Sequence, residues 1–155
     1  MCNALDCVLV HRERVADLPV LCGGLSCSHV TIYADPEAFS ALQESYPAEL
    51  LRHSTDESYG TEFLGYKMAV KVLSSPEEAV AHIARYGSGH SECIVTEDSR
   101  SADYFMKAVD AACVYVNVPT SFTDGGEFRT GCGDRHQYPE TSCSRTDGAG
   151  GTEYL

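Results

Sequence analysis

The stretch KMAVKVLSSPEEAVAHIARYG, residues 67–87, predicts a strand that leads directly into a helix. Residues 67–73 form an apolar, β-branched run of the kind found in strands. Ser75 is expected to cap the helix, because Pro76 suits the first helical position and Glu78 can complete a capping box.

The body and the end of this helix are also indicated by its residues. Ala79, Val80 and Ile83 fall on one face at helical spacing. Gly87 follows the last turn, where glycine commonly adopts a left-handed conformation, so we expect it to end the helix in that way.

The same alternation of strand and helix recurs along the chain, and the apolar run behind Cys2 also has the character of a strand. We expect further strands at 29–35, 93–98 and 113–118 and helices at 36–43 and 99–112. Strands that alternate with helices form parallel sheets covered by helices. The predicted fold class is therefore α/β, with three layers and a mostly parallel sheet.

The composition favours one soluble domain. The chain has 155 residues, 43% of them hydrophobic, and a formal net charge of -12. This charge repels nucleic-acid phosphates and anionic lipid headgroups, so neither nucleic acid nor a membrane is an expected partner. No apolar run is long enough for a membrane helix and the first residues do not resemble a signal peptide, so we expect a cytoplasmic protein.

The chain contains eight cysteines, which are expected to remain reduced in the cytoplasm. Cys93 and Cys113 lie in apolar runs and are interpreted as core residues. A zinc site is an alternative for the others, although their spacing is wider than in the usual zinc knuckles. Its candidate ligands are two pairs, Cys2 with Cys7 and Cys22 with Cys27, and the neighbouring His29.

The end of the sequence has a different composition. Residues 129–154 contain no Val, Ile, Leu, Met or Phe, but they hold five of the 13 glycines. Such a segment cannot bury enough apolar surface to offset the entropy lost on ordering. We therefore expect a folded domain over residues 1–128 and a disordered segment over 129–155.

Five stretches resemble one enzyme family: CNALDCVLVHRE, ESYGTEFLGYKMAVKVL, EEAVAHIARYGSGHSECIVTED, VDAACVYVN and FTDGGEF. They are similar to the C-terminal part of gamma-glutamyl phosphate reductase, also called glutamate-5-semialdehyde dehydrogenase, of the aldehyde dehydrogenase superfamily. The resemblance runs continuously over residues 2–128. It implies an aldehyde-dehydrogenase-like catalytic domain that takes part in the NADPH-dependent reduction of L-glutamyl 5-phosphate to L-glutamate 5-semialdehyde, a step of proline biosynthesis.

The resemblance implies that Cys2 is the catalytic nucleophile, since the family's cysteine is followed by Asn-Ala and an acidic residue. Its thiolate would displace phosphate from the substrate, and NADPH would reduce the resulting thioester. Residues 3–6 are interpreted as the first turn of a helix, whose N-terminus would lower the pKa of the thiol.

By the same resemblance, Glu62 contacts the nicotinamide ribose of NADPH, although an exposed loop glutamate without that role is an equal alternative. His90 is typical of the family but equally fits a structural histidine in a turn. The candidate substrate-binding residues are Asn3, Asn117, Phe122, Thr123 and Asp124.

The sequence departs from the family after Asn117. The chain reads NVPTSFTDG where the family has Asn-Ala-Ser-Thr-Arg-Phe-Thr-Asp-Gly, so Val118, Pro119 and Ser121 replace Ala, Ser and Arg. Losing a cation beside an anionic substrate weakens the expectation that this chain binds it.

The family's dinucleotide-binding portion lies mainly upstream of its cysteine, and this sequence contains no Gly-rich phosphate loop. We therefore expect a C-terminal fragment that is inactive alone and in which the family's homo-oligomeric assembly is in doubt. Inserting one nucleotide into the codon of Phe128 in a family-like continuation yields FRTGCGDRHQYPETSC, residues 128–143. A frameshift is thus our hypothesis for residues 129–155. The alternative function is a non-catalytic binding or zinc-binding module.

Overall fold

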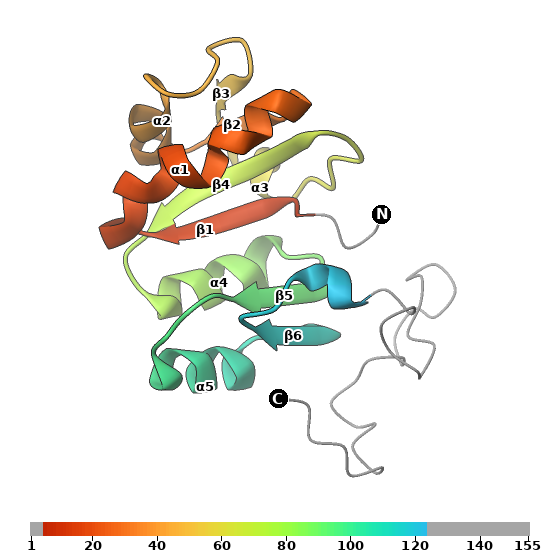
Figure 1. Cartoon of the computed structure of the whole chain (residues 1–155). Helices are drawn as coiled ribbons and strands as arrows, with labels where there is room; N and C mark the ends of the chain where they lie inside the picture. Colours follow the sequence, from red (N-terminus) through yellow and green to blue (C-terminus); the bar gives the residue numbers. More distant parts are fainter. Residues whose placement is uncertain (1–4, 124–155) are drawn as a thin grey trace. The chain divides into compact units, whose positions relative to one another are not determined.

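The computed structural model describes residues 5–123, which fall into two compact units (Figure 1). The first unit is Leu5–Gly87, and the described part of the second covers residues 88–123. The segment 129–155, expected to be disordered, and the expected boundary at residue 128 lie outside the described residues.

The first unit contains a four-stranded sheet of order β1-β4-β2-β3, in which every pair of neighbouring strands is parallel. Its strands are β1 (Cys7–His11), β2 (Thr31–Ala34), β3 (Leu51–His53) and β4 (Lys67–Leu73). Its α-helices are α1 (Leu18–Gly23), α2 (Pro36–Leu42), α3 (Asp56–Tyr59) and α4 (Pro76–Tyr86). Two 3-10 helices, η1 (Arg12–Asp17) and η2 (Gly24–Ser28), flank α1.

One face of this sheet packs against α1 and α2. Successive side chains of a strand point to opposite faces, and Met68, Val70 and Val72 of β4 all belong to one buried apolar cluster. The same cluster contains Leu18 of α1 and Leu42 of α2, which are both fully buried. This cluster is the hydrophobic core of the unit.

The other face of the sheet is covered by α3 and α4. The ammonium group of Lys71 lies 4.7 Å from the centre of the Tyr59 ring on α3. That ring meets the His82 ring of α4 edge-on at 5.0 Å between centroids. Figure 1 shows α1 and α2 on one side of the sheet and α4 on the other. The prediction of a three-layer α/β fold with a parallel sheet is confirmed.

Ser75 caps α4 and Gly87 follows its last residue, both as predicted, but the predicted capping box is not formed because Glu78 bonds Ser74 and not Ser75. Ser75 Oγ accepts a hydrogen bond from the Glu78 N–H, while the Glu78 carboxylate accepts one from the Ser74 N–H. Gly87 has φ -64° and ψ 149°, so the predicted left-handed cap is wrong. Its N–H donates to the Ile83 carbonyl at 2.7 Å, and the chain then leaves the helix in extended conformation.

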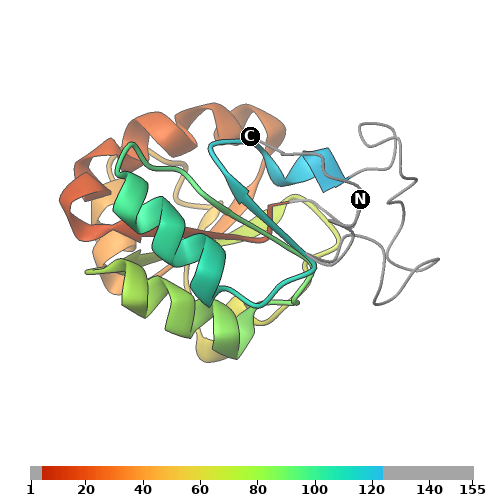
Figure 2. The same cartoon turned by 90° about the horizontal axis from the view of Figure 1, so that it is seen from below.

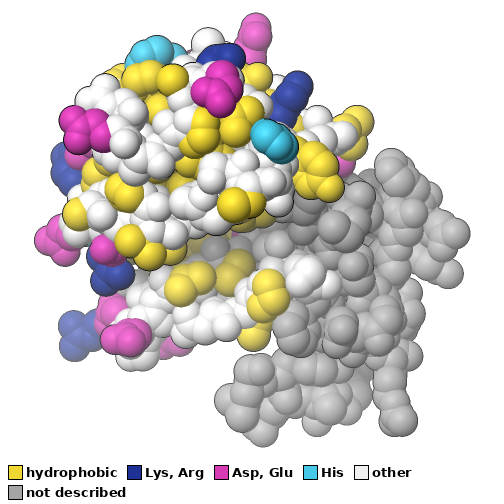
Figure 3. All heavy atoms as spheres, turned by 45° about the horizontal axis from the view of Figure 1, so that its top comes forward, with side chains coloured by type: hydrophobic (Ala, Val, Ile, Leu, Met, Phe, Trp, Pro, Cys, Tyr) yellow, Lys and Arg dark blue, Asp and Glu magenta, His cyan; other side chains and the backbone are white. Residues whose placement is uncertain are grey.

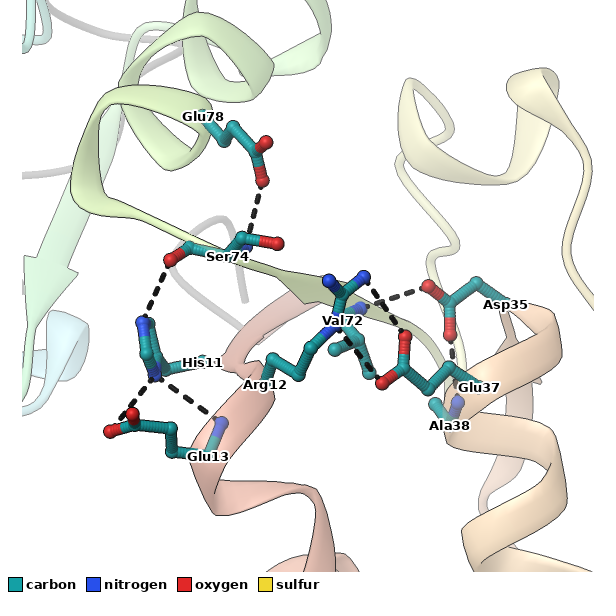
Figure 4. A network of polar contacts seen from close by, with 9 residues as sticks. All are labelled: His11, Arg12, Glu13, Asp35, Glu37, Ala38, Val72, Ser74 and Glu78. Carbon is teal, nitrogen blue, oxygen red and sulfur yellow. Dashed lines mark hydrogen bonds and ion pairs between the residues drawn. The ribbon is translucent and has the colours of Figure 1, made fainter.

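A polar network closes the carboxyl edge of this sheet (Figure 4). Asp35 caps α2 by accepting a hydrogen bond from the Ala38 N–H, and its second carboxylate oxygen accepts one from the Val72 N–H. At the end of β1, Nε2 of His11 is hydrogen-bonded to the Ser74 carbonyl at 2.9 Å. These contacts fix the ends of three neighbouring strands relative to one another.

The second unit contains the parallel pair β5 (Ser91–Ile94) and β6 (Cys113–Val116), the helix α5 (Ser99–Ala108) and the 3-10 helix η3 (Thr120–Thr123). Figures 1 and 2 show α5 alongside the two strands. Cys113 is buried, as predicted for a core residue.

The boundaries in this unit differ from the predicted ones. The strand predicted at 93–98 begins at Ser91 and ends at Ile94, because Asp98 already caps α5. The helix ends at Ala108, since Val109 is extended and buried. The strand predicted at 113–118 ends at Val116, before a left-handed Asn117.

Apolar side chains also remain on the surface, as the space-filling view shows (Figure 3). In the first unit, Val20 and Leu21 of α1 and Leu64 and Tyr66 of the loop before β4 are all more than half exposed. Among the described residues, no helix combines the length and apolar character that crossing a membrane requires.

Candidate active site

The predicted nucleophile Cys2 lies outside the described residues, as do Asn3 and Asp124. The described chain starts at Leu5, just before β1. The Ala69 N–H donates to the Asp6 carbonyl at 2.7 Å, so Asp6 already pairs with the chain at the start of β4. The predicted helical turn at residues 3–6 is therefore wrong for its described half, Leu5 and Asp6.

Glu62 lies in the loop between α3 and β4, and its side chain is exposed. Burial raises the pKa of the Asp6 carboxyl, a hydrogen bond from the Phe63 backbone lowers it, and the charge of Glu62 raises it. Asp6 follows Cys2 by four residues. The structure thus brings Glu62, the predicted ribose-binding residue, close to Asp6.

The loop that carries Glu62 is held at several points. The rings of Phe63 and Tyr33 stack with centroids 5.2 Å apart and planes 6° from parallel. The Tyr66 carbonyl accepts a hydrogen bond from the Thr31 N–H at 2.8 Å. Leu64, between these anchors, has a positive φ of 44°. Such a loop can present a carboxylate in a defined direction.

Asp6 and Glu62 lie at the amino edge of the sheet, where β1 and β4 begin. In open parallel α/β sheets, ligands usually bind beyond the carboxyl ends of the strands. Here the hydrogen bonds around Asp35 and His11 occupy that edge. Asp6 and Glu62 thus lie at the edge opposite to the one that the fold class alone would indicate for a ligand.

The second group of predicted residues begins at Asn117, which directly follows β6. The side-chain amide of Asn117 makes two hydrogen bonds with the backbone of Thr96, one from the Thr96 N–H and one to its carbonyl, each 2.9 Å long. The Cys93 thiol donates to the Val118 carbonyl at 2.9 Å. Phe122 and Thr123 follow in the 3-10 helix η3.

His90 is in a turn, consistent with the structural alternative for this residue. Its N–H is hydrogen-bonded to the Ser88 hydroxyl at 3.4 Å, and its carbonyl accepts a hydrogen bond from the Cys113 N–H at 2.9 Å. Gly89 before it has a φ of 70°, which glycine adopts readily. His90 therefore begins the pairing of β5 with β6 through its main chain.

Those proposed zinc ligands that the structure describes are not brought together. Cys22 lies on α1 and is part of the hydrophobic core. Val8 and Val10 of β1 pack against or within that core, so Cys7, one residue out of phase, faces the other side of the sheet. Cys27 is exposed in η2. Within residues 5–123, no group of three or more His, Cys, Asp or Glu side chains is placed to hold a metal ion.

Two titratable residues that the sequence interpretation passed over have strongly shifted pKa values. Burial, with smaller effects of Lys71 and Arg85, lowers the pKa of His82 to about 4. Its spacing from Ala79 and Tyr86 on α4 could have revealed that it faces the sheet. Burial also raises the pKa of Glu92 on β5 to about 7, which its position in a short strand did not reveal.

The chain resembles known proteins over most of its length. It is 61% identical over 131 residues to gamma-glutamyl phosphate reductase of Phocaeicola vulgatus and 59% identical over 131 residues to that of Bacteroides thetaiotaomicron. Each match covers 84% of this chain and 31% of the relative. The chain thus spans about a third of the length of these curated relatives. No family model matches it.

Solved structures agree with the sequence comparison. The crystal structure of gamma-glutamyl phosphate reductase from Thermotoga maritima matches with a TM-score of 0.78 and 35% identity, covering 86% of this chain and 31% of that protein. The enzyme of the same name from Saccharomyces cerevisiae matches with a TM-score of 0.62 and 30% identity, covering 81% and 32%. Over most of its length the chain is therefore similar to gamma-glutamyl phosphate reductase, of which it matches a segment of about a third of the length.

Proposed function

We propose that this chain supplies the nucleophile of a gamma-glutamyl phosphate reductase, the enzyme that reduces L-glutamyl 5-phosphate to L-glutamate 5-semialdehyde in proline biosynthesis. The observation that carries the proposal is the 61% identity over 131 residues to an enzyme of that name. The proximity of Asp6, four residues after Cys2, to Glu62 supports it. Since the chain spans 31% of such relatives, we expect no turnover by the chain alone.

Cys2 is the proposed nucleophile. Its thiolate attacks the acyl carbon of L-glutamyl 5-phosphate, a carbon–sulfur bond forms, the carbon–oxygen bond to phosphate breaks, and inorganic phosphate leaves. The product of this step is a thioester on Cys2. Because Leu5 and Asp6 are not helical, we do not attribute activation of the thiol to a helix that includes them.

The described residues fit one part of NADPH. The Glu62 carboxylate is exposed on an anchored loop, and a carboxylate can accept hydrogen bonds from ribose hydroxyls. No turn from a strand to a helix within residues 5–123 has a G-x-G-x-x-G sequence that would cradle the phosphates. When bound, NADPH would supply the hydride that reduces the thioester. Glu62 is the residue of this chain that would hold the ribose.

The substrate side is proposed to lie along Asn3 and the segment that begins at Asn117. Ser121, which stands where the family has arginine, is exposed and carries no charge. A bidentate arginine contact to a phosphate or carboxylate is therefore not available at this position. We expect this chain to bind the anionic substrate more weakly than relatives that keep the arginine.

Complementation tests the proposed function. The purified 155-residue chain is mixed with the upstream part of the Phocaeicola vulgatus enzyme, and NADPH oxidation is followed with L-glutamyl 5-phosphate. We expect oxidation only when both parts are present. Cys2→Ala should abolish it, whereas Cys27→Ala, at an exposed cysteine of η2, should leave it unchanged.

Three outcomes would contradict this proposal. Undiminished oxidation with Cys2→Ala would exclude Cys2 as the nucleophile. A complete lack of oxidation in the wild-type mixture would show that this chain does not complete the enzyme. Zinc bound at about one ion per chain would instead favour the alternative of a zinc-binding module, and elemental analysis of the purified chain measures it.

A further inference from the structure

Both ends of the side-chain amide of Asn117 are hydrogen-bonded to the backbone at the end of β5. Its Oδ1 accepts a hydrogen bond from the Thr96 N–H and its Nδ2 donates one to the Thr96 carbonyl, both at 2.9 Å. The Asn117 main-chain N–H donates to the Ile94 carbonyl, also at 2.9 Å. The amide thus continues the parallel pairing of β5 and β6 by one further pair of hydrogen bonds.

The backbone of Asn117 explains why asparagine suits this position. Its φ of 57° lies in the left-handed region, which asparagine tolerates better than most residues with a Cβ. The left-handed turn ends β6 and directs the chain into residues 118–123. Backbone conformation and amide contacts therefore act together at one residue.

A second contact holds the same segment. The Cys93 thiol donates to the Val118 carbonyl at 2.9 Å. Burial raises the pKa of Cys93, which keeps the thiol protonated as this contact requires. Because the acceptor is a main-chain oxygen, the contact does not depend on the side chain at position 118, where this sequence departs from the family. Pro119 follows with a restricted φ and leads into η3.

We propose that Asn117 is a positioning residue that does not contact the substrate itself. Its two side-chain hydrogen bonds with the Thr96 backbone, called the clamp below, set the direction of residues 118–123. The proposal rests on the proposed function only in taking this segment as the substrate side. The clamp itself stands on the hydrogen bonds between Asn117 and Thr96.

Amide hydrogen exchange on the 155-residue chain tests the clamp. In Asn117→Gly, which keeps access to the left-handed backbone and removes both amide contacts, exchange at Thr96 should be faster by roughly tenfold. Exchange over residues 118–123 should also rise. In Asn117→Asp, which keeps one acceptor, the Thr96 N–H should remain protected. Unchanged exchange at Thr96 and over 118–123 in Asn117→Gly would overturn the clamp.

The second contact gives an independent check if the Asn117 variants do not fold. Cys93→Ala removes the thiol donor, and exchange over residues 118–123 should become faster. Cys93→Ser keeps a donor and should restore much of the protection. Equal exchange over residues 118–123 in wild type and Cys93→Ala would contradict the proposal that hydrogen bonds from β5 hold these residues in place.

Activity in the complemented enzyme separates positioning from direct contact. Thr96→Pro leaves Asn117 unchanged but removes the Thr96 N–H that donates to the Asn117 side chain. Thr96→Ala keeps this N–H and is the matched control. If Asn117 acts through the clamp, Thr96→Pro and Asn117→Gly should raise KM for L-glutamyl 5-phosphate by similar factors, and the double variant should add little. A KM effect in Asn117→Gly alone, additive with Thr96→Pro, would make Asn117 a substrate contact and overturn the proposal. Failure of the wild-type mixture to oxidise NADPH would count against the proposed function, while the exchange results would still decide the clamp.

Discussion

The Asp35 carboxylate accepts a hydrogen bond from the backbone N–H of Val72, 3.0 Å away and 37 residues later in the chain. Its other oxygen caps α2 through the Ala38 N–H at 2.8 Å. One side chain thus joins the start of a helix to the end of the central strand β4. A residue that satisfies two backbone donors in different elements should contribute to stability beyond an ordinary helix cap.

Asp35→Ala should lower the free energy of unfolding by about 2–3 kcal/mol, because it removes the cap and leaves the Val72 N–H without its acceptor. Asp35→Asn keeps only one acceptor oxygen and should lose most of the same amount. Urea denaturation followed by circular dichroism measures both. Asp103→Ala, at an exposed position of α5, is the control, and an equal loss there would contradict this assignment.

His82 should make the first unit sensitive to acid. Burial lowers its pKa in the folded chain to about 4 from an ordinary value of 6.5, so the folded state binds fewer protons than the unfolded state between these values. Stability should therefore be unaffected above about pH 6.5 and fall as the pH drops toward 4, by on the order of 1–3 kcal/mol. His82→Phe should remove this part of the pH dependence, as measured by urea denaturation at several pH values. His53→Gln, at an exposed histidine, should retain it.

Glu92 should lower stability at high pH, whereas His82 lowers it at low pH. Burial raises its pKa to about 7 from 4.5, so the folded state favours the protonated carboxyl. Its contribution to stability is present below about pH 4.5 and is lost as the pH rises through 7. Glu92→Gln should therefore be more stable than wild type at pH 8, by on the order of 1–2 kcal/mol, and similar to it at pH 4. Thermal unfolding at the two pH values measures this. A similar gain in Glu97→Gln, at an exposed glutamate on the same segment, would count against it.

Asp6 should hold the loop of Glu62 through the Phe63 N–H. Asp6→Ala removes the acceptor, and exchange of the Phe63 amide should become several-fold faster. Asp6→Asn retains a carbonyl acceptor and should keep most of the protection. Exchange that is equally slow in wild type and Asp6→Ala would show that the Tyr33 stack alone orders this loop.

Short sequence patterns correctly predicted the elements that are stabilised by interactions within a few residues. The run KMAVKVL and the cap at Ser75 predicted β4 and the start of α4, because side-chain alternation and helix capping act over a few residues. The helix ends at Gly87 as predicted, but the left-handed conformation predicted for Gly87 was wrong, since glycine permits such a cap and does not require one. No element was predicted between residues 44 and 66, where β3 depends on its pairing with β2 and α3 is a helix of only four residues.

The sequence by itself determined the parallel α/β fold, the starts of the main helices and the resemblance that names Cys2, Glu62 and Asn117 as candidates. These properties follow from periodicity, capping residues and residue identity. Only the tertiary structure decided that Asp6 lies beside the Glu62 loop, that Cys7 and Cys22 face opposite sides of the sheet, and that the Asn117 amide is hydrogen-bonded to the Thr96 backbone. Each of these depends on strand order and register, which bring together residues that are far apart in the chain.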